Sequence, residues 1–176
     1  GDVFEDARNS YLLKRMETTA KRTIWALMLQ VRKGKFVPSG FEVSFSRAER
    51  LDAVQFQLGE DEKMRLRGRI DRIDTYETDD KVYVKIIDYK SGNTSFSLLN
   101  FYYGLQLQLA VYLDAAMELE QKKHPGKQVE PAGVFYYHID DPMLDQEEDE
   151  TDEAWGRRML KALRMDGLVN ADRKVV

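Results

Sequence analysis

The chain has 176 residues, of which 43% are hydrophobic and 11% aromatic, so it can form a core and is not a disordered chain. It has no cysteine and no apolar run long enough to cross a bilayer, which excludes disulfides, thiolate-bound metal centres and a membrane-spanning class. The net charge is −4, but nine acidic residues lie within 140–153, so the rest of the chain carries +5, a mildly basic balance that permits phosphate binding.

The first predicted element is an amphipathic helix over 9–32, in which apolar residues recur close to every 3.6 positions. Asn9 or Ser10 is its expected cap, and Gly34 its expected stop. Three strands are predicted next, at 36–45 with a turn at 38–40, at 64–74, and at 82–88 after a turn at 77–80. The unbroken β-prone run of the third predicts a central strand buried on both faces.

A second long helix is predicted over 97–121, with Ser97 or Thr94 near its cap, and Pro125 and Gly126 break the chain after it. A strand over 132–139, a solvated acidic loop over 140–153 and a helix over 153–165, ended by Asp166 and Gly167, complete the order. An antiparallel hairpin followed by a strand that returns after a helical crossover predicts an α/β fold with a mixed sheet.

Two short segments, GRIDRID at 68–74 and IIDYKSG at 86–92, carry the residues with the clearest chemical use. Asp71 lies on the first strand of the predicted hairpin, and Asp88 and Lys90 lie two residues apart at the end of the second. Residues two apart on a strand project to one face, so Asp88 and Lys90 point to one site. Once the hairpin closes, Asp71 lies opposite Asp88.

These residue types suit metal-assisted hydrolysis of a phosphodiester. Asp71 and Asp88 offer the hard oxygen ligands that Mg²⁺ or Mn²⁺ prefers, and the carbonyl of Tyr89 offers another. The ammonium of Lys90 can orient an attacking water or neutralise charge on the phosphate. The pattern also has a structural interpretation, because acidic residues often form turns at strand ends and Asp-x-Lys occurs by chance in many proteins.

The two segments, together with GLQLQLAVYLDAAM at 104–117, resemble the RecB-like branch of the PD-(D/E)XK nuclease superfamily. Within this branch the chain is similar to the AddB-type nuclease domains of bacterial AddAB (RexAB) helicase–nuclease complexes. Further similar segments are FVPSGFEVSF at 36–45, AGVFYYHIDDPML at 132–144 and KALRMDGLV at 161–169. The resemblance covers nearly the whole chain and implies a restriction-endonuclease-like mixed sheet flanked by helices.

The resemblance implies a role for each candidate residue. Asp71 and Asp88 correspond to the two metal-binding aspartates, and Lys90 to the catalytic lysine. Gln108 and Tyr112 match the family's Gln-x-x-x-Tyr motif on one helix face, where they contact the DNA strand or stabilise the site. On periodicity alone, Gln108 is a polar break in an amphipathic helix and Tyr112 is a core residue.

The function that this implies is a metal-dependent DNA exonuclease domain, acting in double-strand-break repair in the cytoplasm. Its expected partners are DNA and an AddA-like helicase–nuclease subunit, with which it forms a heterodimer, and no membrane is expected. Mg²⁺ or Mn²⁺ is the expected cofactor. From the two ends of the chain, we expect 1–176 to be one nuclease domain of a longer protein, truncated on both sides.

Two features depart from the family pattern. RecB-like nucleases carry a further metal ligand, often histidine, well before the first aspartate, whereas His124 and His138 follow it here. Full-length AddB-type proteins hold a [4Fe–4S] cluster on four cysteines, and this chain has none. Two alternatives therefore stay open: a non-catalytic DNA-channel or subunit-docking module with the nuclease fold, or a stand-alone RecB- or Cas4-like exonuclease.

Overall fold

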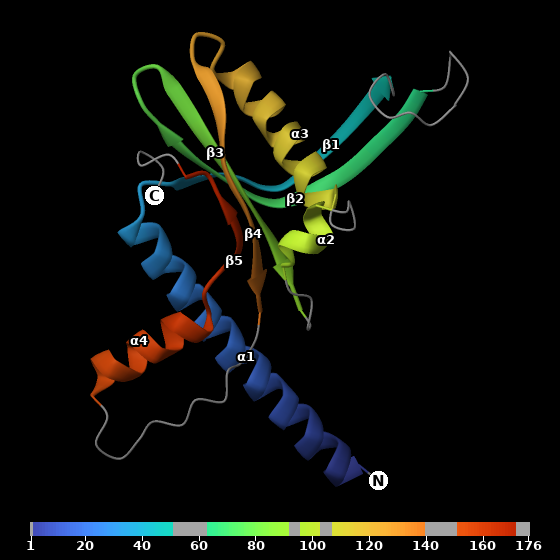
Figure 1. Cartoon of the computed structure of the whole chain (residues 1–176). Coiled ribbons are helices and arrows are strands. Elements are labelled where there is room, and N and C mark those ends of the chain that lie inside the picture. The colour runs from blue at the N-terminus through green and yellow to red at the C-terminus, as the bar shows by residue number, and fades with distance from the viewer. Residues whose placement is uncertain (1, 51–62, 92–95, 103–106, 140–150, 172–176) are drawn as a thin grey trace. The chain divides into compact units, whose positions relative to one another are not determined.

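The computed structural model describes residues 2–50, 63–91, 96–102, 107–139 and 151–171 (Figure 1). They belong to two compact units. The first unit comprises Gly1–Phe36, Tyr89–Ser95 and Tyr136–Asp166, and the second comprises Val37–Asp88, Phe96–Phe135 and Gly167–Val176. Within the described ranges, no helix is long and apolar enough to cross a membrane.

Helix α1 spans Asp2–Lys33 and therefore begins well before the predicted start at residue 9. Asn9 and Ser10 lie inside the helix, so their predicted role as its cap is wrong. Residues 2–8 contain neither glycine nor proline, and nothing in the sequence interrupts the helix there. The end is as predicted, because the Gly34 amide donates to the Gln30 carbonyl at 3.1 Å and closes the last turn.

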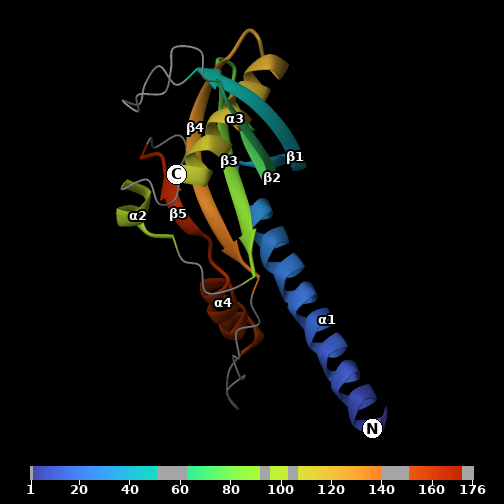
Figure 2. The same cartoon turned by 90° about the vertical axis from the view of Figure 1, so that its right-hand side faces the viewer.

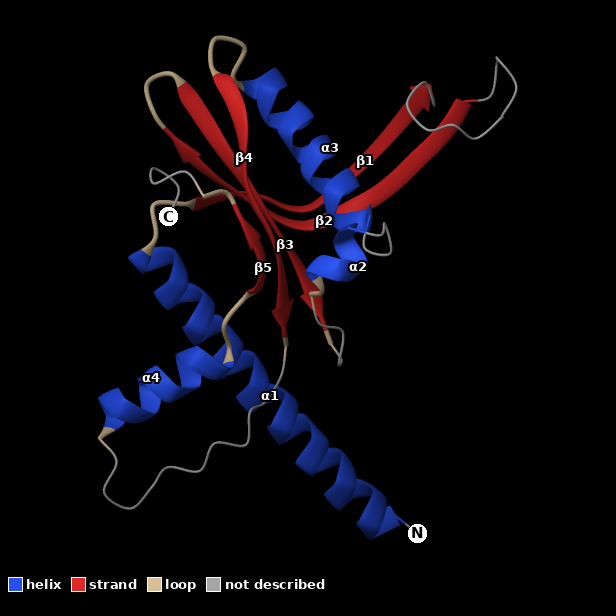
Figure 3. Cartoon of the chain, viewed as in Figure 1, coloured by secondary structure: helices blue, strands red, loops and turns tan. Residues whose placement is uncertain are grey.

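Five strands form one sheet in the order β1-β2-β3-β4-β5 (Figure 3). They are β1 Val37–Arg50, β2 Lys63–Glu77, β3 Lys81–Lys90, β4 Gln128–His138 and β5 Asp166–Val169. The pairs β1–β2 and β2–β3 are antiparallel. The backbone bonds from Gln128 to Asp80 and from Ile139 to Lys90 advance in the same direction, so β4 runs parallel to β3 (Figures 1 and 2). The predicted mixed sheet is confirmed.

The strands differ from the prediction mainly at their ends. Ser39 and Gly40, predicted as part of a turn, lie in β1, where the register with β2 shifts between Pro38 and Gly40. Strand β5 was missed, because it has only four residues and begins at Asp166 and Gly167, which predict the end of a helix. The main chain of Gly167 lies against the Val134 carbonyl of β4, so closely that a Cβ would collide with it. Glycine is required for this close approach of two strands.

The predicted helix over 97–121 is described in two parts, α2 Leu98–Tyr102 and α3 Leu107–Lys123, on either side of residues that lie outside the description. Ser97 caps α2 as predicted, since its Oγ accepts a hydrogen bond from the Asn100 amide at 3.2 Å. Thr94, the other predicted cap, lies outside the described residues.

Helix α4 spans Asp152–Ala162 and begins inside the segment predicted as an acidic loop. Thr151 is its N-cap, and Thr151 Oγ1 accepts a hydrogen bond from the Ala154 amide. Asp152 and Glu153 form the first turn, where carboxylates complement the positive end of the helix dipole. The assignment of Asp152 to the loop is therefore wrong, whereas Glu153 lies in the helix that was predicted to begin there. Residues 140–150 of the predicted loop lie outside the description.

Each unit has its own apolar core. In the second unit, the central strands and α3 supply the buried residues, which include Ile70, Ile73, Val84, Ile86, Ile87, Leu109 and Ala116. The burial of β3 on both faces agrees with its predicted central position. In the first unit, Ala26 of α1 packs with Met159 of α4 and Leu163.

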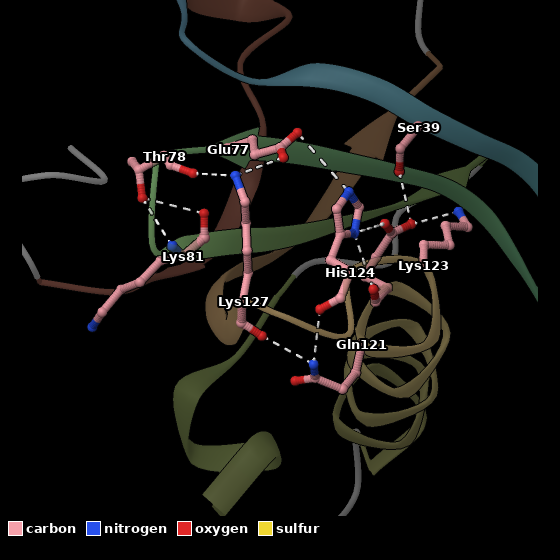
Figure 4. A network of polar contacts seen from close by, with 9 residues as sticks. Ser39, Glu77, Thr78, Lys81, Gln121, Lys123, His124 and Lys127 are labelled. Carbon is pink, nitrogen blue, oxygen red and sulfur yellow. Dashed lines mark hydrogen bonds and ion pairs between the residues drawn. The ribbon is translucent and has the colours of Figure 1, made fainter.

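A polar network fixes the C-terminal end of α3 to β1 (Figure 4). Glu120 is only 1% exposed, and its carboxylate accepts hydrogen bonds from Ser39 Oγ at 3.2 Å and from Lys123 Nζ at 2.7 Å. Lys127, just beyond the helix, donates to Glu77 of β2 at 2.8 Å and thereby lowers the pKa of that carboxyl. These contacts fix the C-terminal end of α3 against β1 and β2.

Candidate active site

Asp71 and Asp88 lie where β2 and β3 separate. The antiparallel register between the two strands ends at the pair Arg72↔Ile87. Asp71 is the next residue on β2 and Asp88 the next on β3, so the carboxylates directly follow the last register pair. Strand β2 continues alongside β1 as far as Lys63. The register therefore brings the two predicted metal ligands together where β2 and β3 diverge, a point that we call the fork. Figure 1 shows the divergence of the two strands.

Both carboxylates project to the same face of the fork. Asp71 lies two residues from Ile73, and Asp88 lies two residues from Ile86, which is the register partner of Ile73. Both isoleucines are 1% exposed, Asp88 is 6% exposed and Asp71 is half-buried. Two carboxylates beside a low-dielectric apolar surface repel each other, and a cation between them relieves that repulsion.

The neighbouring strand β1 is irregular at the same level. Its register with β2 passes from Phe41↔Arg72 to Val43↔Ile70, which places Glu42 across from Asp71. Glu42 has a φ of 51°, in the left-handed region that costs a residue with a Cβ about 1 kcal/mol. Its exposed side chain forms an ion pair with Arg69 at 2.8 Å. Such strain concentrates at functional segments, and here it lies one strand from the fork.

The opposite face of β2 and β3 carries a buried ion cluster of mixed sign, which we call the ion triad: Arg72, Asp74 and Lys85. Arg72 Nε donates to Asp74 Oδ1 at 2.6 Å and its Nη2 donates to Oδ2 at 2.9 Å, a bidentate pair. Lys85, the register partner of Asp74, lies 3.3 Å from Oδ2. The side chains of Arg72 and Asp74 are 4% and 1% exposed.

Burial shifts the titration of the triad. Desolvation lowers the pKa of Lys85, and the Asp74 carboxylate opposes this shift only in part. Aromatic rings extend the cluster, with Phe41 at 6.0 Å from the Arg72 guanidinium and Phe135 at 6.0 Å from Lys85 Nζ. This group was not predicted from the sequence, although the alternation of Arg72 and Asp74 with Ile70 on one face of β2 was a usable signal.

Tyr89 and Lys90 follow Asp88 on β3 and belong to the first unit. By strand alternation, Lys90 projects to the side of β3 that carries Asp88. Lys90 Nζ lies 5.4 Å from the centre of the Tyr136 ring, and its carbonyl accepts a hydrogen bond from the Ile139 amide at 3.0 Å. The half-buried lysine is therefore held at its side chain by Tyr136 of β4 and at its backbone by Ile139, the residue that follows β4.

Gln108 and Tyr112 contact each other on α3, because Gln108 Nε2 donates to the Tyr112 hydroxyl at 2.8 Å. The Tyr112 ring meets Phe45 edge to face, with centroids 5.5 Å apart, directly over Gly68, where a Cβ would collide with both rings. By alternation, Gly68 shares its face with Arg72 and not with Asp71. The role of Gln108 and Tyr112 at the site stays a prediction.

The oxygen donors at the fork fit a hard divalent cation. Mg²⁺ is commonly held by one or two carboxylates together with substrate phosphates, which is the number that Asp71 and Asp88 supply. Within the described part of the chain, no group of three or more acidic, histidine or cysteine side chains comes together as a metal cage. The donor set matches a metal that binds jointly with its substrate.

A mixed five-stranded sheet with flanking helices, carrying paired carboxylates at a fork, defines the class of restriction-endonuclease-like folds and confirms the predicted architecture. The sequence matches the family model of the PD-(D/E)XK nuclease superfamily over residues 2–173. The chain belongs to this superfamily, as the motif resemblance predicted.

Curated relatives extend the match over the whole chain. Proteins named as subunits of an ATP-dependent helicase/deoxyribonuclease are 47% identical in Lachnoclostridium phytofermentans, 43% in Alkaliphilus metalliredigens and 40% in Thermoanaerobacter sp. (strain X514). The alignments cover 100%, 100% and 96% of this chain, but only 14%, 15% and 14% of the relatives. The chain therefore corresponds to about one seventh of the proteins it matches.

Proposed function

We propose that this chain is the metal-dependent deoxyribonuclease domain of a larger helicase–nuclease subunit. The observation that carries the proposal is the fork, where Asp71 and Asp88 emerge side by side on one face of two diverging strands. Membership of a nuclease superfamily, and relatives whose names include deoxyribonuclease, support the same chemistry.

In this proposal Asp71 and Asp88 hold Mg²⁺ or Mn²⁺, with the carbonyl of Tyr89 as a further oxygen donor. When bound, such an ion polarises the phosphate and lowers the pKa of a coordinated water. Lys90 orients the attacking water by hydrogen bonding or neutralises charge that develops on the phosphate oxygens. Gln108 and Tyr112 contact the DNA strand or support the site from α3.

The substrate is DNA, bound through its backbone with little dependence on base sequence. The relatives are named as one subunit of a helicase/deoxyribonuclease, which supports a complex with a further subunit. In this proposal the partner is an AddA-like helicase–nuclease subunit, and the complex acts on double-strand breaks in the cytoplasm. The share of those relatives that the chain covers favours this context over a stand-alone exonuclease. Within the longer protein, 1–176 would form a single nuclease domain, and any [4Fe–4S] cluster would lie outside this cysteine-free segment.

The test is strand cleavage by the full helicase–nuclease complex that contains this subunit, with end-labelled DNA. We expect Asp88→Ala and Lys90→Ala each to abolish cleavage of one strand, a loss of at least about 100-fold, while unwinding continues. Asp79→Ala is the matched control, since Asp79 is an exposed aspartate at the turn of the same hairpin. Undiminished cleavage of both strands by both variants would refute the proposal.

A second candidate is a non-catalytic DNA-channel or docking module that keeps the nuclease fold. It is favoured by one observation, that no group of three or more acidic, histidine or cysteine side chains comes together among the described residues. The two candidates differ in their response to Mn²⁺. If the chain is a nuclease, Mn²⁺ at one hundred times its dissociation constant should stabilise the folded state by about 2.7 kcal/mol and raise the melting temperature accordingly. Asp71→Ala should lose this stabilisation. Equal melting with and without Mn²⁺ would favour the docking module.

A further inference from the structure

A pocket outside the candidate active site lies between α1 and α4 in the first unit. Its volume is about 480 Å³, within the range of small-ligand sites. The lining residues are Lys21, Arg22 and Trp25 from α1, and Asp152 and Trp155 from α4. The chain has only two tryptophans, and both line this pocket.

The two indole rings form an open aromatic corner. Their centroids are 6.5 Å apart and their planes are inclined by 41°. Trp155 is anchored, because it packs against the apolar cluster of Ala26, Met159 and Leu163. Trp25 is 37% exposed, so part of a large apolar ring is left in contact with solvent. An anchored ring beside an exposed one provides a rigid surface for a flat ligand to stack on.

Two basic side chains and one acidic side chain line this corner together with the rings. The Arg22 guanidinium lies 5.9 Å from the centre of the Trp155 ring, and Lys21 also lines the pocket. Between residues 9 and 33, α1 has six basic residues and one acidic residue: Lys14, Arg15, Lys21, Arg22, Arg32 and Lys33 against Glu17. Lys21 is paired with Glu17, and Asp152 adds one negative group to the lining.

We propose that this pocket is a stacking site for one base of single-stranded DNA, with Arg22 and Lys21 against the flanking phosphates. Aromatic rings next to cations match a nucleotide, which combines a flat π-face with a negative backbone. A ligand that joins a flat ring to a negative group suits two indole rings with a guanidinium 5.9 Å from the centre of one of them. A duplex would bury its bases away from the rings. The proposal rests on the proposed function in that DNA is the substrate, and it adds a subsite in the first unit that binds the strand.

The test uses the tryptophan fluorescence of the 176-residue chain, because its only two tryptophans report on the pocket itself. The probe is a (dT)20 oligonucleotide in buffer with EDTA, so that binding is measured without the metal-dependent reaction. We expect saturable quenching by (dT)20, and little quenching by the same sequence in a duplex or by polyphosphate of equal charge.

Variants assign the effect to the pocket, with affinity measured by the anisotropy of labelled (dT)20. Trp25→Leu should weaken binding about tenfold, since one stacked base contributes a factor of this size. Arg22→Gln should weaken it less and reduce the salt dependence by about one ion. Tyr11→Leu is the matched control, because Tyr11 is an exposed aromatic residue of α1 outside the pocket, and its affinity should equal that of the parent chain. Thermal melts verify that each variant is folded, and Trp25→Phe, which keeps an aromatic face, should fall between Trp25→Leu and the parent.

The proposal is supported if single strands quench the parent chain and Trp25→Leu binds labelled (dT)20 more weakly in the anisotropy assay, whatever the cleavage assay gives. Equal quenching by polyphosphate, or an unchanged affinity of Trp25→Leu, would overturn it by reducing the pocket to a basic surface. Absence of quenching at saturating (dT)20 would also overturn it and would assign the aromatic corner to a protein contact. None of these results depends on the metal, so the proposed nuclease activity stands or falls separately.

Discussion

The two faces of β2 and β3 both carry charged residues, but they differ in how the signs of the charges are grouped. On one face, Asp71 and Asp88 place two carboxylates together at the end of the ladder. On the other, one residue further along β2, the ion triad surrounds a single carboxylate with two cations at 2.6 to 3.3 Å. The first arrangement groups two like charges, and the second groups opposite charges.

The contrast separates two uses of an aspartate within one motif. GRIDRID contains Asp71 and Asp74, three residues apart, and strand alternation sends them to opposite faces. Asp74 is built into the fold, whereas Asp71 lies half-buried where the strands part. If this interpretation is right, removal of the two side chains should have very different consequences for stability.

The largest expected effect is that of Asp74→Ala. It leaves the buried guanidinium of Arg72 and the ammonium of Lys85 without their shared carboxylate, and loss of one partner from a buried ion pair costs about 3–5 kcal/mol. Urea denaturation of the parent chain and the variant measures the difference.

Asp71→Ala is the matched comparison, in metal-free buffer. Because it removes one of two like charges, we expect its free energy of unfolding to lie within about 1 kcal/mol of the parent's. Equal losses in the two variants would show that the faces do not differ in the way described.

A smaller effect is expected from pH, through Lys85. Its lowered pKa means that the unfolded chain, with a lysine pKa of 10.5, binds the proton more tightly than the native protein does. Between the native pKa and 10.5, this residue therefore makes the native state more stable as pH rises. Lys85→Met should lack that gain, so its deficit relative to the parent should grow towards pH 10.5.

The measurement is the difference in free energy of unfolding between the parent and Lys85→Met across this pH range. Tyr137, whose pKa is raised to about 12 by burial, acts with the opposite sign above pH 10, because the native state keeps a proton that the unfolded chain loses. That contribution is common to both proteins and cancels in the difference. A deficit that stays constant with pH would place Lys85 outside the buried cluster.

The sequence predicted the order of the main elements well, because each long element has a clear period or an unbroken β-prone run. The central position of β3 followed from its composition alone, and Gly34 and Ser97 marked helix ends correctly. The short edge strand β5 could not be found in this way. Its pairing depends on a close approach of Gly167 to β4, and four residues carry too little periodicity to reveal it.

Prediction of the site was limited by tertiary contacts. The pairing of Asp71 with Asp88 could be expected from hairpin symmetry, but the separation of the strands directly beyond Arg72 could not. The contact of Gln108 with Tyr112 could be predicted from their helical spacing. The packing of the Tyr112 ring over Gly68 could not, because it depends on how α3 lies against the sheet. Trp25 and Trp155 are 130 positions apart, so nothing local in the sequence indicated a shared pocket.

The ion triad also bears on how the hairpin finds its alignment. A slip of two residues keeps every side chain on its own face, so hydrophobic alternation alone does not oppose it. One such slip would set Lys85 opposite Arg72, cation against cation, and the other would set Asp74 opposite Ile87, a charge against a hydrocarbon. In either slipped hairpin Asp71 would no longer meet Asp88. The buried charges on one side thus select the single alignment that assembles the carboxylates on the other.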